Sequence, residues 1–299
     1  MAENLERAED RLDNIRSVEP ILSALRTISH SSWQNARRKL HDLRGYHQRL
    51  TNLIAYILPH IKPPPGSKIS DRDGSHKTIL LVLGSERGLC GRFHIDLANH
   101  LHFTLSSKQD DDPDIELWVI GSRLKHRLER RGCPISWFQP TSPSGIPNFD
   151  LTFEWLGFLL KEYEEGKVET ILLMHNVATR GGRIQPQTVQ LIPPILSSWN
   201  KESNKIQWPP PIIETDPNAL YARLIEQHLA TQFLQTLLES AAAEHSTRFH
   251  LMEEATKNAE RLMEELKNLV QLSRRQAITQ EMEELIVGSG LLKDENDFE

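Results

Sequence analysis

The last quarter of the chain contains a proline-free stretch that is too long for a compact domain. Residues 218–292 include no proline, and their only glycines, Gly288 and Gly290, lie near the end. A helix over this stretch would be about 110 Å long at 1.5 Å per residue. Because such a helix exceeds the diameter of an ordinary domain, it must project beyond the globular part.

Both ends of the chain carry apolar residues at alternating spacings of three and four, which is the pattern of a coiled-coil seam. In the last helix the predicted seam is Met252, Ala255, Ala259, Leu262, Leu266 and Leu269. In the first helix it is Ile15, Val18, Leu22, Leu25, Ser29, Ser32 and Ala36. After a four-residue step, interpreted as a stutter, it resumes at Leu40, Leu43, His47, Leu50, Ile54 and Ile57. Pro20 predicts that this helix either begins there or is kinked.

Two proline-rich breaks separate these helices from a central region with a different period. The breaks are residues 59–76 and 208–217. Between them short apolar runs alternate with helical stretches, which predicts a mostly parallel sheet flanked by helices. The expected strands are 78–83, 116–120, 135–138, 169–174 and 188–192, and the expected helices are 93–105, 123–131 and 149–164. The predicted parts are 1–60, an α/β domain at 76–212, the last helix at 214–292 and an acidic tail at 293–299.

Composition excludes several classes of function. The net charge of −6 argues against a dedicated nucleic-acid binder. No apolar run approaches the roughly 18 residues of a membrane-spanning helix, and the first residues resemble neither a signal nor a transit peptide. Cys90 and Cys133 are too few for a disulfide framework, which favours a reducing, cytosol-facing location, and they show no metal-ligand spacing. We expect no metal and no cofactor.

The strongest candidate for a ligand site is the glycine-containing loop Gly84–Gly91. Its glycines match neither the GxGxxG fingerprint nor the P-loop. We therefore expect Gly88 and Gly91 to serve backbone geometry in a strand-to-helix turn. Cys90 is interpreted as a small buried residue rather than a nucleophile, and the segment 178–183 (ATRGGR) as a turn.

Basic residues on the two long helices are stronger candidates for partner contacts. Arg37 and Arg38 lie on the first helix, and Arg274 and Arg275 on the last. Geometry forces these helices out of the globular body, where a basic band could meet an acidic partner. A solvated helix face is the alternative interpretation.

Three segments resemble the gamma subunit of rotary F-type ATP synthases. They are SERGLCG after the first strand, SAAAEHSTRFHLMEEATKNAERLMEEL in the last helix, and RRQAITQEMEELIVGSG near its end. The resemblance is strong over 76–97 and 214–292. It implies a central Rossmann-like α/β domain inserted between two helices that form an antiparallel coiled coil.

By this resemblance the chain is a rotor shaft that couples rotation of a membrane c ring, driven by protons or sodium ions, to ATP chemistry on the alpha and beta subunits. The expected beta-subunit contacts are Arg274, Arg275, Thr279, Gln280 and Glu281. Glu214 is expected near the c ring, and the epsilon subunit near the α/β domain. The implied location is peripheral, on the cytoplasmic face of the inner membrane.

This sequence departs from the family pattern in three places. The first helix reads TISHSSWQN at 27–35, where an apolar run is usual, Arg92 replaces a glycine, and an acidic tail ends the chain. The leading hypothesis is a gamma subunit with no active site of its own. The alternatives are a gamma-like paralogue acting as a coiled-coil adaptor, or a nucleotide-binding α/β protein that uses the Gly84–Gly91 loop.

Overall fold

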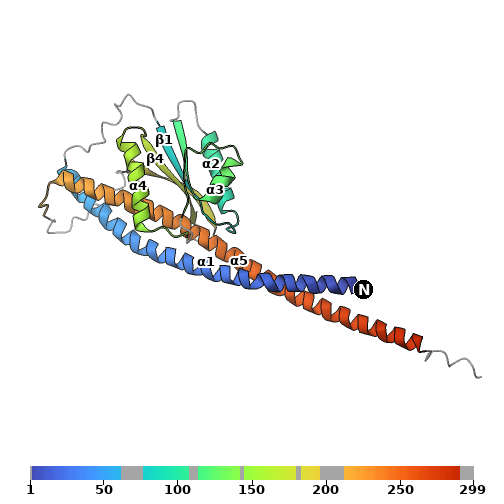
Figure 1. Ribbon diagram of the computed structural model, residues 1–299. Helices are drawn as coiled ribbons and strands as arrows, with labels where there is room; N and C mark the ends of the chain where they lie inside the picture. The colour runs from blue at the N-terminus through green and yellow to red at the C-terminus, as the bar shows by residue number, and fades with distance from the viewer. Residues whose placement is uncertain are drawn as a thin grey trace, which may run out of the picture. The chain divides into compact units, whose positions relative to one another are not determined.

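One long helix comes before a five-stranded sheet in the chain, and a second long helix follows it (Figure 1). The computed structural model describes residues 2–61, 77–107, 114–141, 145–179, 183–195 and 212–289, so the predicted acidic tail lies outside the described residues. Helix α1 spans Ala2–Ile57 and is followed by the 3₁₀ turn Leu58–His60, and α5 spans Pro217–Gly288. The chain divides into two compact units, one of 1–28 with 249–299 and one of 29–248.

The larger unit contains the sheet, with strand order β3-β2-β1-β4-β5. The strands are β1 (Lys77–Leu83), β2 (Asp114–Ile120), β3 (Trp137–Gln139), β4 (Thr170–Ala178) and β5 (Ile184–Ile192). Strands β3, β2, β1 and β4 are parallel, and β5 is antiparallel to β4. The predicted mostly parallel α/β domain is therefore confirmed. Residues 180–182 of the predicted turn at 178–183 lie outside the described residues, and on either side of them the Thr179 amide donates to the Arg183 carbonyl at 2.8 Å.

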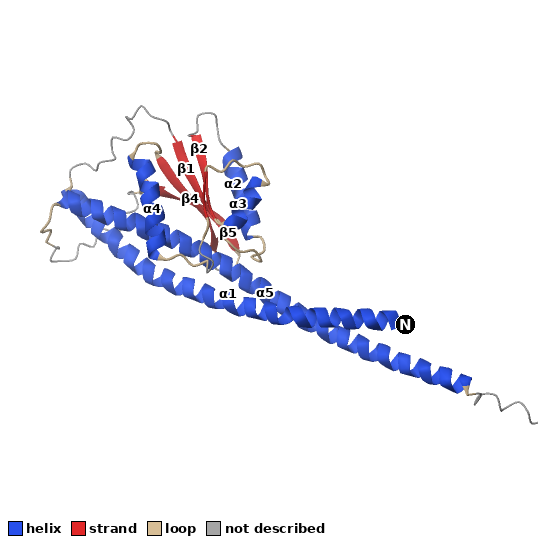
Figure 2. Ribbon diagram, in the orientation of Figure 1, coloured by secondary structure: helices blue, strands red, loops and turns tan. Residues whose placement is uncertain are grey.

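The sheet is covered on both faces (Figure 2). Helices α2 (Phe93–Ser106) and α3 (Ser122–Glu129) cover one face, and α4 (Phe149–Glu164) with α5 covers the other. Leu80 and Val82 of β1 face α2 and α3, whereas Leu81 and Leu83 face α4 and α5. Burial on both faces explains why β1 is an uninterrupted apolar run rather than an alternating one.

The segment 228–248 of α5 is buried on nearly every side. Leu229 and Phe233 pack with the sheet and α4, Leu234 and Leu238 pack with α1, and Ala243 packs with the α2–α3 side. A helix that is apolar all round is a core helix. The start of α5 is set by Asp216, whose carboxylate accepts from the amides of the first turn, at 3.4 and 3.2 Å, ahead of Pro217.

Helix α1 in the larger unit follows a regular seven-residue repeat. The buried and half-buried residues that follow this repeat are Ser29, Trp33, Ala36, Leu40, Leu43, His47, Leu50, Ile54 and Ile57. This repeat needs no stutter, because Trp33, which is half-buried like its neighbour Ser32, precedes Ala36 at the regular spacing and packs with Leu40 and Leu234. Sequence also left open a start at Pro20, but the helix runs through it from Ala2.

The smaller unit consists of the N-terminal part of α1 and the C-terminal part of α5, each of which has a buried stripe. On α1 the buried positions are Ala8 and Leu12. On α5 the stripe of buried and half-buried positions is Met252, Thr256, Ala259, Met263, Leu266, Val270, Ser273 and Ala277.

The predicted seam of α5 is therefore correct for Met252, Ala259 and Leu266 but out of phase at Leu262 and Leu269. Leu262 and Leu269 are 37% and 47% exposed. Each has an apolar neighbour, Met263 or Val270, that takes the buried position, so apolar spacing alone could not choose between two adjacent stripes. On α1 the predicted seam residue Val18 is likewise 47% exposed.

We predict that Leu266→Ala lowers the free energy of unfolding by about 2–3 kcal/mol, because it removes a buried side chain from the seam. Leu269→Ala is the matched control and should change it by less than about 0.5 kcal/mol, since that side chain is largely exposed. Urea unfolding followed by circular dichroism gives both values. Equal losses for the two variants would contradict the observed phase of the seam.

Candidate functional site

The loop after β1 uses its glycines for close packing rather than for ligand approach. A Cβ at Gly84 would lie 2.4 Å from the Leu124 Cβ and 2.9 Å from the Ile120 carbonyl oxygen. Gly91 has a φ of +56°, as expected for a glycine that serves a turn. Gly88 has no positive φ; Leu89 takes the left-handed conformation instead, with a φ of 59°. The geometric role expected of Gly91 is confirmed, but that of Gly88 is not, because a Cβ there would meet only the Arg123 side chain, at 3.8 Å.

The position where a doubly wound sheet commonly binds phosphate is filled by the side chain of Glu86. Its carboxylate accepts hydrogen bonds from the amide and hydroxyl of Ser122 and from the amide of Thr141. Burial opposes ionisation, but these bonds outweigh it and lower the pKa of Glu86. The N-terminus of α3 therefore already holds an anion.

A buried arginine holds the loop against α5. The Arg248 guanidinium donates to the Gly88 carbonyl at 3.1 Å from two of its nitrogens and to the Arg87 carbonyl at 3.4 Å. It also pairs with the carboxylate of Glu244 and reaches His245. Burial raises the pKa of the Glu244 carboxyl, and the adjacent guanidinium opposes that rise. Because Arg248 is 6% exposed, its bonds are shielded from water and fix the loop geometry.

The cysteine and histidine of this loop do not form a nucleophilic pair. The Cys90 Sγ lies 3.5 Å from the His94 Nδ1, and the Ser85 hydroxyl oxygen lies 2.9 Å from the His94 Nε2. Burial raises the pKa of the Cys90 thiol to about 11. Burial, helped by Arg127 and Arg248, lowers the pKa of His94 to about 4. Both groups are neutral at pH 7, whereas nucleophilic catalysis needs the thiolate.

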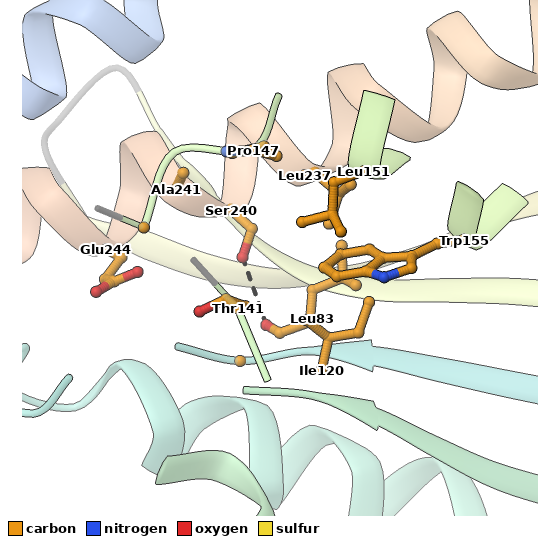
Figure 3. A pocket seen from close by; sticks show the side chains of 12 residues that line it. Leu83, Ile120, Thr141, Pro147, Leu151, Trp155, Leu237, Ser240, Ala241 and Glu244 are labelled. Carbon is orange, nitrogen blue, oxygen red and sulfur yellow. Dashed lines mark hydrogen bonds between the residues drawn. The ribbon is translucent and has the colours of Figure 1, made fainter. Parts of the chain in front are cut away.

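A cavity of about 30 Å³ lies at the carboxyl ends of β1 and β2 (Figure 3). It is lined by side chains of α4 and α5, including Trp155, Leu237 and Glu244. Pockets that hold a nucleotide or a drug-sized ligand are some ten times larger. Among the described residues, no group of three or more histidine, cysteine or acidic side chains could hold a metal ion.

Two histidines meet where α1 packs on α5 in the larger unit. The rings of His47 and His228 are 4.6 Å apart between centroids. Burial, together with the charge of His47, lowers the pKa of His228 to about 4, and burial also lowers the pKa of His47. Arg44 pairs with Glu239 at 3.2 Å in the same stretch, and these contacts show that the helices run antiparallel here.

The predicted contact residues of α5 lie on its exposed end, in the smaller unit. Arg274 pairs with Glu9 of α1 through two guanidinium nitrogens, a contact that sequence reasoning missed. Arg275 is exposed, and its carbonyl accepts from the Thr279 hydroxyl at 2.9 Å. Gln280 donates to Glu284 at 3.1 Å, and Glu281 is exposed.

The remaining predicted contact residues lie in the larger unit and are exposed. The Arg37 guanidinium lies 5.5 Å from the centre of the Trp33 ring, which it covers. Arg38 and Glu214 are both exposed. These three residues belong to the larger unit and the end of α5 belongs to the smaller one, so each set is described as a surface of its own unit.

Comparison with known proteins identifies relatives of the whole chain. The family model described as ATP synthase matches residues 4–291. The ATP synthase gamma chain of Chlorobium phaeobacteroides strain BS1 is 26% identical over 95% of this chain and 97% of the relative. That of Pasteurella multocida strain Pm70 is 25% identical over 94% of this chain and 97% of the relative.

Solved structures share the fold at low sequence identity. A chain from the Euglena gracilis mitochondrial ATP synthase (OSCP, F1 and c ring) aligns with a TM-score of 0.65 at 13% identity, covering 100% of this chain and 99% of that one. A chain from the Tetrahymena thermophila mitochondrial central stalk and c ring has a TM-score of 0.52 at 15% identity, covering 79% of this chain and 99% of that one.

We predict that Arg248→Met lowers the free energy of unfolding by about 3 kcal/mol, because it leaves the buried Glu244 carboxyl without its guanidinium partner and the Gly88 carbonyl without its donor. Arg92→Met is the control: among the described residues Arg92 pairs with Asp96 alone, at the surface, and its loss should cost less than about 0.5 kcal/mol. Urea unfolding measures both. A loss at Arg248 no larger than that at Arg92 would contradict the proposed anchoring of the loop.

We also predict that stability falls between pH 7.5 and pH 5. The folded-state pKa of His228 is lowered, so its contribution is complete above the unfolded pKa near 6.5 and is lost as the pH falls toward 4. At pH 5 the loss amounts to about 2 kcal/mol for this group. Urea unfolding at the two pH values measures the free energy of unfolding. In His228→Leu this free energy should decline by about 2 kcal/mol less than in the unaltered chain. An unchanged decline in the variant would show that His228 does not carry it.

Proposed function

We propose, since the chain belongs to the ATP synthase family and matches its gamma chains over nearly the whole length, that it is the central rotor shaft of an F-type ATP synthase. In this role it transmits rotation of a membrane c ring, driven by protons or sodium ions, to the alpha and beta subunits that synthesise or hydrolyse ATP. The shaft itself carries out no chemistry.

The observation that carries this proposal is the exposed apolar surface of the smaller unit. The largely exposed apolar side chains there are Val18, Ile21, Ile28, Leu269, Leu272, Ile278, Met282, Leu285, Ile286 and Val287. Apolar side chains gathered on an exposed element mark a surface that a partner covers. A helical rod with apolar outer faces is suited to turning inside a ring of partner subunits.

The state of the β1 loop supports a non-catalytic role. Cys90 is a neutral thiol, and Glu86 fills the anion position at α3. The nearby cavity of about 30 Å³ is too small for a nucleotide. These features argue against the nucleotide-binding alternative and favour ATP chemistry on other subunits.

We assign the contact with a beta-subunit loop to Arg274 and Arg275, with Thr279, Gln280 and Glu281 beside them. All five residues are exposed on α5 beyond the last deeply buried seam position, Val270. A guanidinium at such a place can form charge-assisted hydrogen bonds in one rotary position and lose them in the next. Arg37 and Arg38 provide a second basic surface for the ring.

The foot of the shaft is assigned to the α/β domain, with Glu214 toward the c ring and the epsilon subunit against the domain. None of the described helices contains an apolar stretch long enough to cross a membrane. From the match to ATP synthase gamma chains, we propose that the chain is held at the cytoplasmic face of the inner membrane through its partners.

Co-purification tests this function against the adaptor alternative. A tagged chain expressed in its own organism should bring down alpha and beta subunits in a complex with ATPase activity. A chain that purifies without either subunit would contradict the proposal and favour an adaptor.

We predict that Arg274→Ala lowers ATPase turnover or coupling of the assembled complex, because it removes a contact that gates rotation. The free chain should keep its free energy of unfolding within about 0.5 kcal/mol, since the side chain is exposed. Arg261→Ala is the control, because Arg261 makes an exposed pair with Glu265 on the same helix. Unchanged turnover and coupling in the double variant Arg274→Ala, Arg275→Ala would show that the contact assignment is wrong.

A further inference from the structure

The contact between Arg274 and Glu9 joins the two ends of the chain in the smaller unit. The Arg274 Nε donates to Glu9 Oε1 at 3.1 Å, and Nη2 donates to the same oxygen. The residues are 265 positions apart in sequence, and their side chains are 63% and 38% exposed. The pair therefore lies at the surface, within reach of a partner.

The pair sits where the seam ends. Ala8, next to Glu9, is 4% exposed, and Val270, one turn before Arg274, is 6% exposed. From Ile278 to Ser289 every described residue is exposed. Arg274 therefore occupies the boundary between the part of α5 that packs in its own unit and the part that is left uncovered.

The pair between Arg274 and Glu9 is not bidentate, because it uses only one carboxylate oxygen. Both donors of Arg274 converge on one oxygen, and among the described residues neither Glu9 Oε2 nor Arg274 Nη1 makes a hydrogen bond. A fork-to-fork pair would use both oxygens and would be stronger. The guanidinium thus has a free edge on which a second carboxylate could begin to bind before Glu9 leaves.

The residue after Arg274 provides an initial contact. Arg275 is exposed and forms no ion pair with any residue in the described part of the chain. An approaching carboxylate can therefore meet Arg275 without displacing any group. The same carboxylate would then replace Glu9 on the neighbouring Arg274.

We propose that Glu9 is an internal competitor for Arg274, which it holds until a carboxylate of the surrounding partner ring replaces it. This inference rests on the proposed function, in which Arg274 contacts a beta subunit. The partner group is a carboxylate, because displacing one anion from a guanidinium requires another of similar strength. Glu9 thereby weakens the partner contact and keeps it reversible.

The expected effect is modest. Exposed ion pairs change an equilibrium by about two- to fivefold. Glu9→Gln keeps the size of the side chain and its hydrogen-bonding ability but removes the competing charge. The variant should therefore bind the partner ring about two- to fivefold better than the unaltered chain.

Competition during reconstitution tests the proposal. Equal amounts of differently tagged unaltered and variant full-length chains are mixed with a limiting amount of alpha and beta subunits, and the ratio of tags in the purified complex is measured. Asp10→Asn is the matched control, because Asp10 is an exposed neighbouring acid with no ion pair to a described residue. We expect a two- to fivefold excess for Glu9→Gln and equal incorporation for Asp10→Asn.

The double variant separates the possible failures. Adding Glu9→Gln to Arg274→Ala should give no further gain, because the group for which Glu9 competes is absent. Three results would overturn the competitor role alone. The first is a gain from Glu9→Gln that persists in the Arg274→Ala background, and the second is an equal gain for Asp10→Asn. The third is no gain for Glu9→Gln although the unaltered chain outcompetes Arg274→Ala. Incorporation of Arg274→Ala equal to that of the unaltered chain would instead remove the partner contact itself.

Discussion

The larger unit depends on one segment of α5 that is buried on several sides at once. Residues 228–248 supply side chains to all three hydrophobic clusters. Two of these clusters lie on the two faces of the sheet, and the third lies between α1 and α5. Phe233 faces α4 and the sheet, and Leu238 faces α1. Since Arg248 at the end of this segment also holds the β1 loop, the helix, the sheet and the loop are positioned together.

Much of this architecture could be predicted from residue patterns because the patterns reflect burial. Strand β1 is apolar throughout because it is covered on both faces, and its limits were predicted to within one residue. The phase of the α5 seam was not, because Leu262 beside Met263 and Leu269 beside Val270 offer two apolar stripes one residue apart. The choice depends on the partner helix, which lies more than 200 residues away in sequence.

In the candidate site, too, residues with a local sequence signal could be predicted, and contacts between distant helices could not. Arg274 and Arg275 were predicted from a motif whose residues lie close together in the chain. Glu9 was not, since its pairing depends on the register between two distant helices. Arg248 had a local signal, because Glu244 precedes it by one helical turn inside an apolar stretch and buried charges normally occur in pairs.

The central claim is that α5 turns inside a ring of partner subunits, and a reversible lock tests it most directly. Met282 is 57% exposed on α5, so a cysteine there can carry a cleavable photo-crosslinker to the surrounding subunits. In the assembled complex, crosslinking should abolish ATP hydrolysis in proportion to the fraction of complex linked, and cleavage of the linker should restore it. Full ATPase activity in a complex whose shaft is completely linked to the ring would contradict the account.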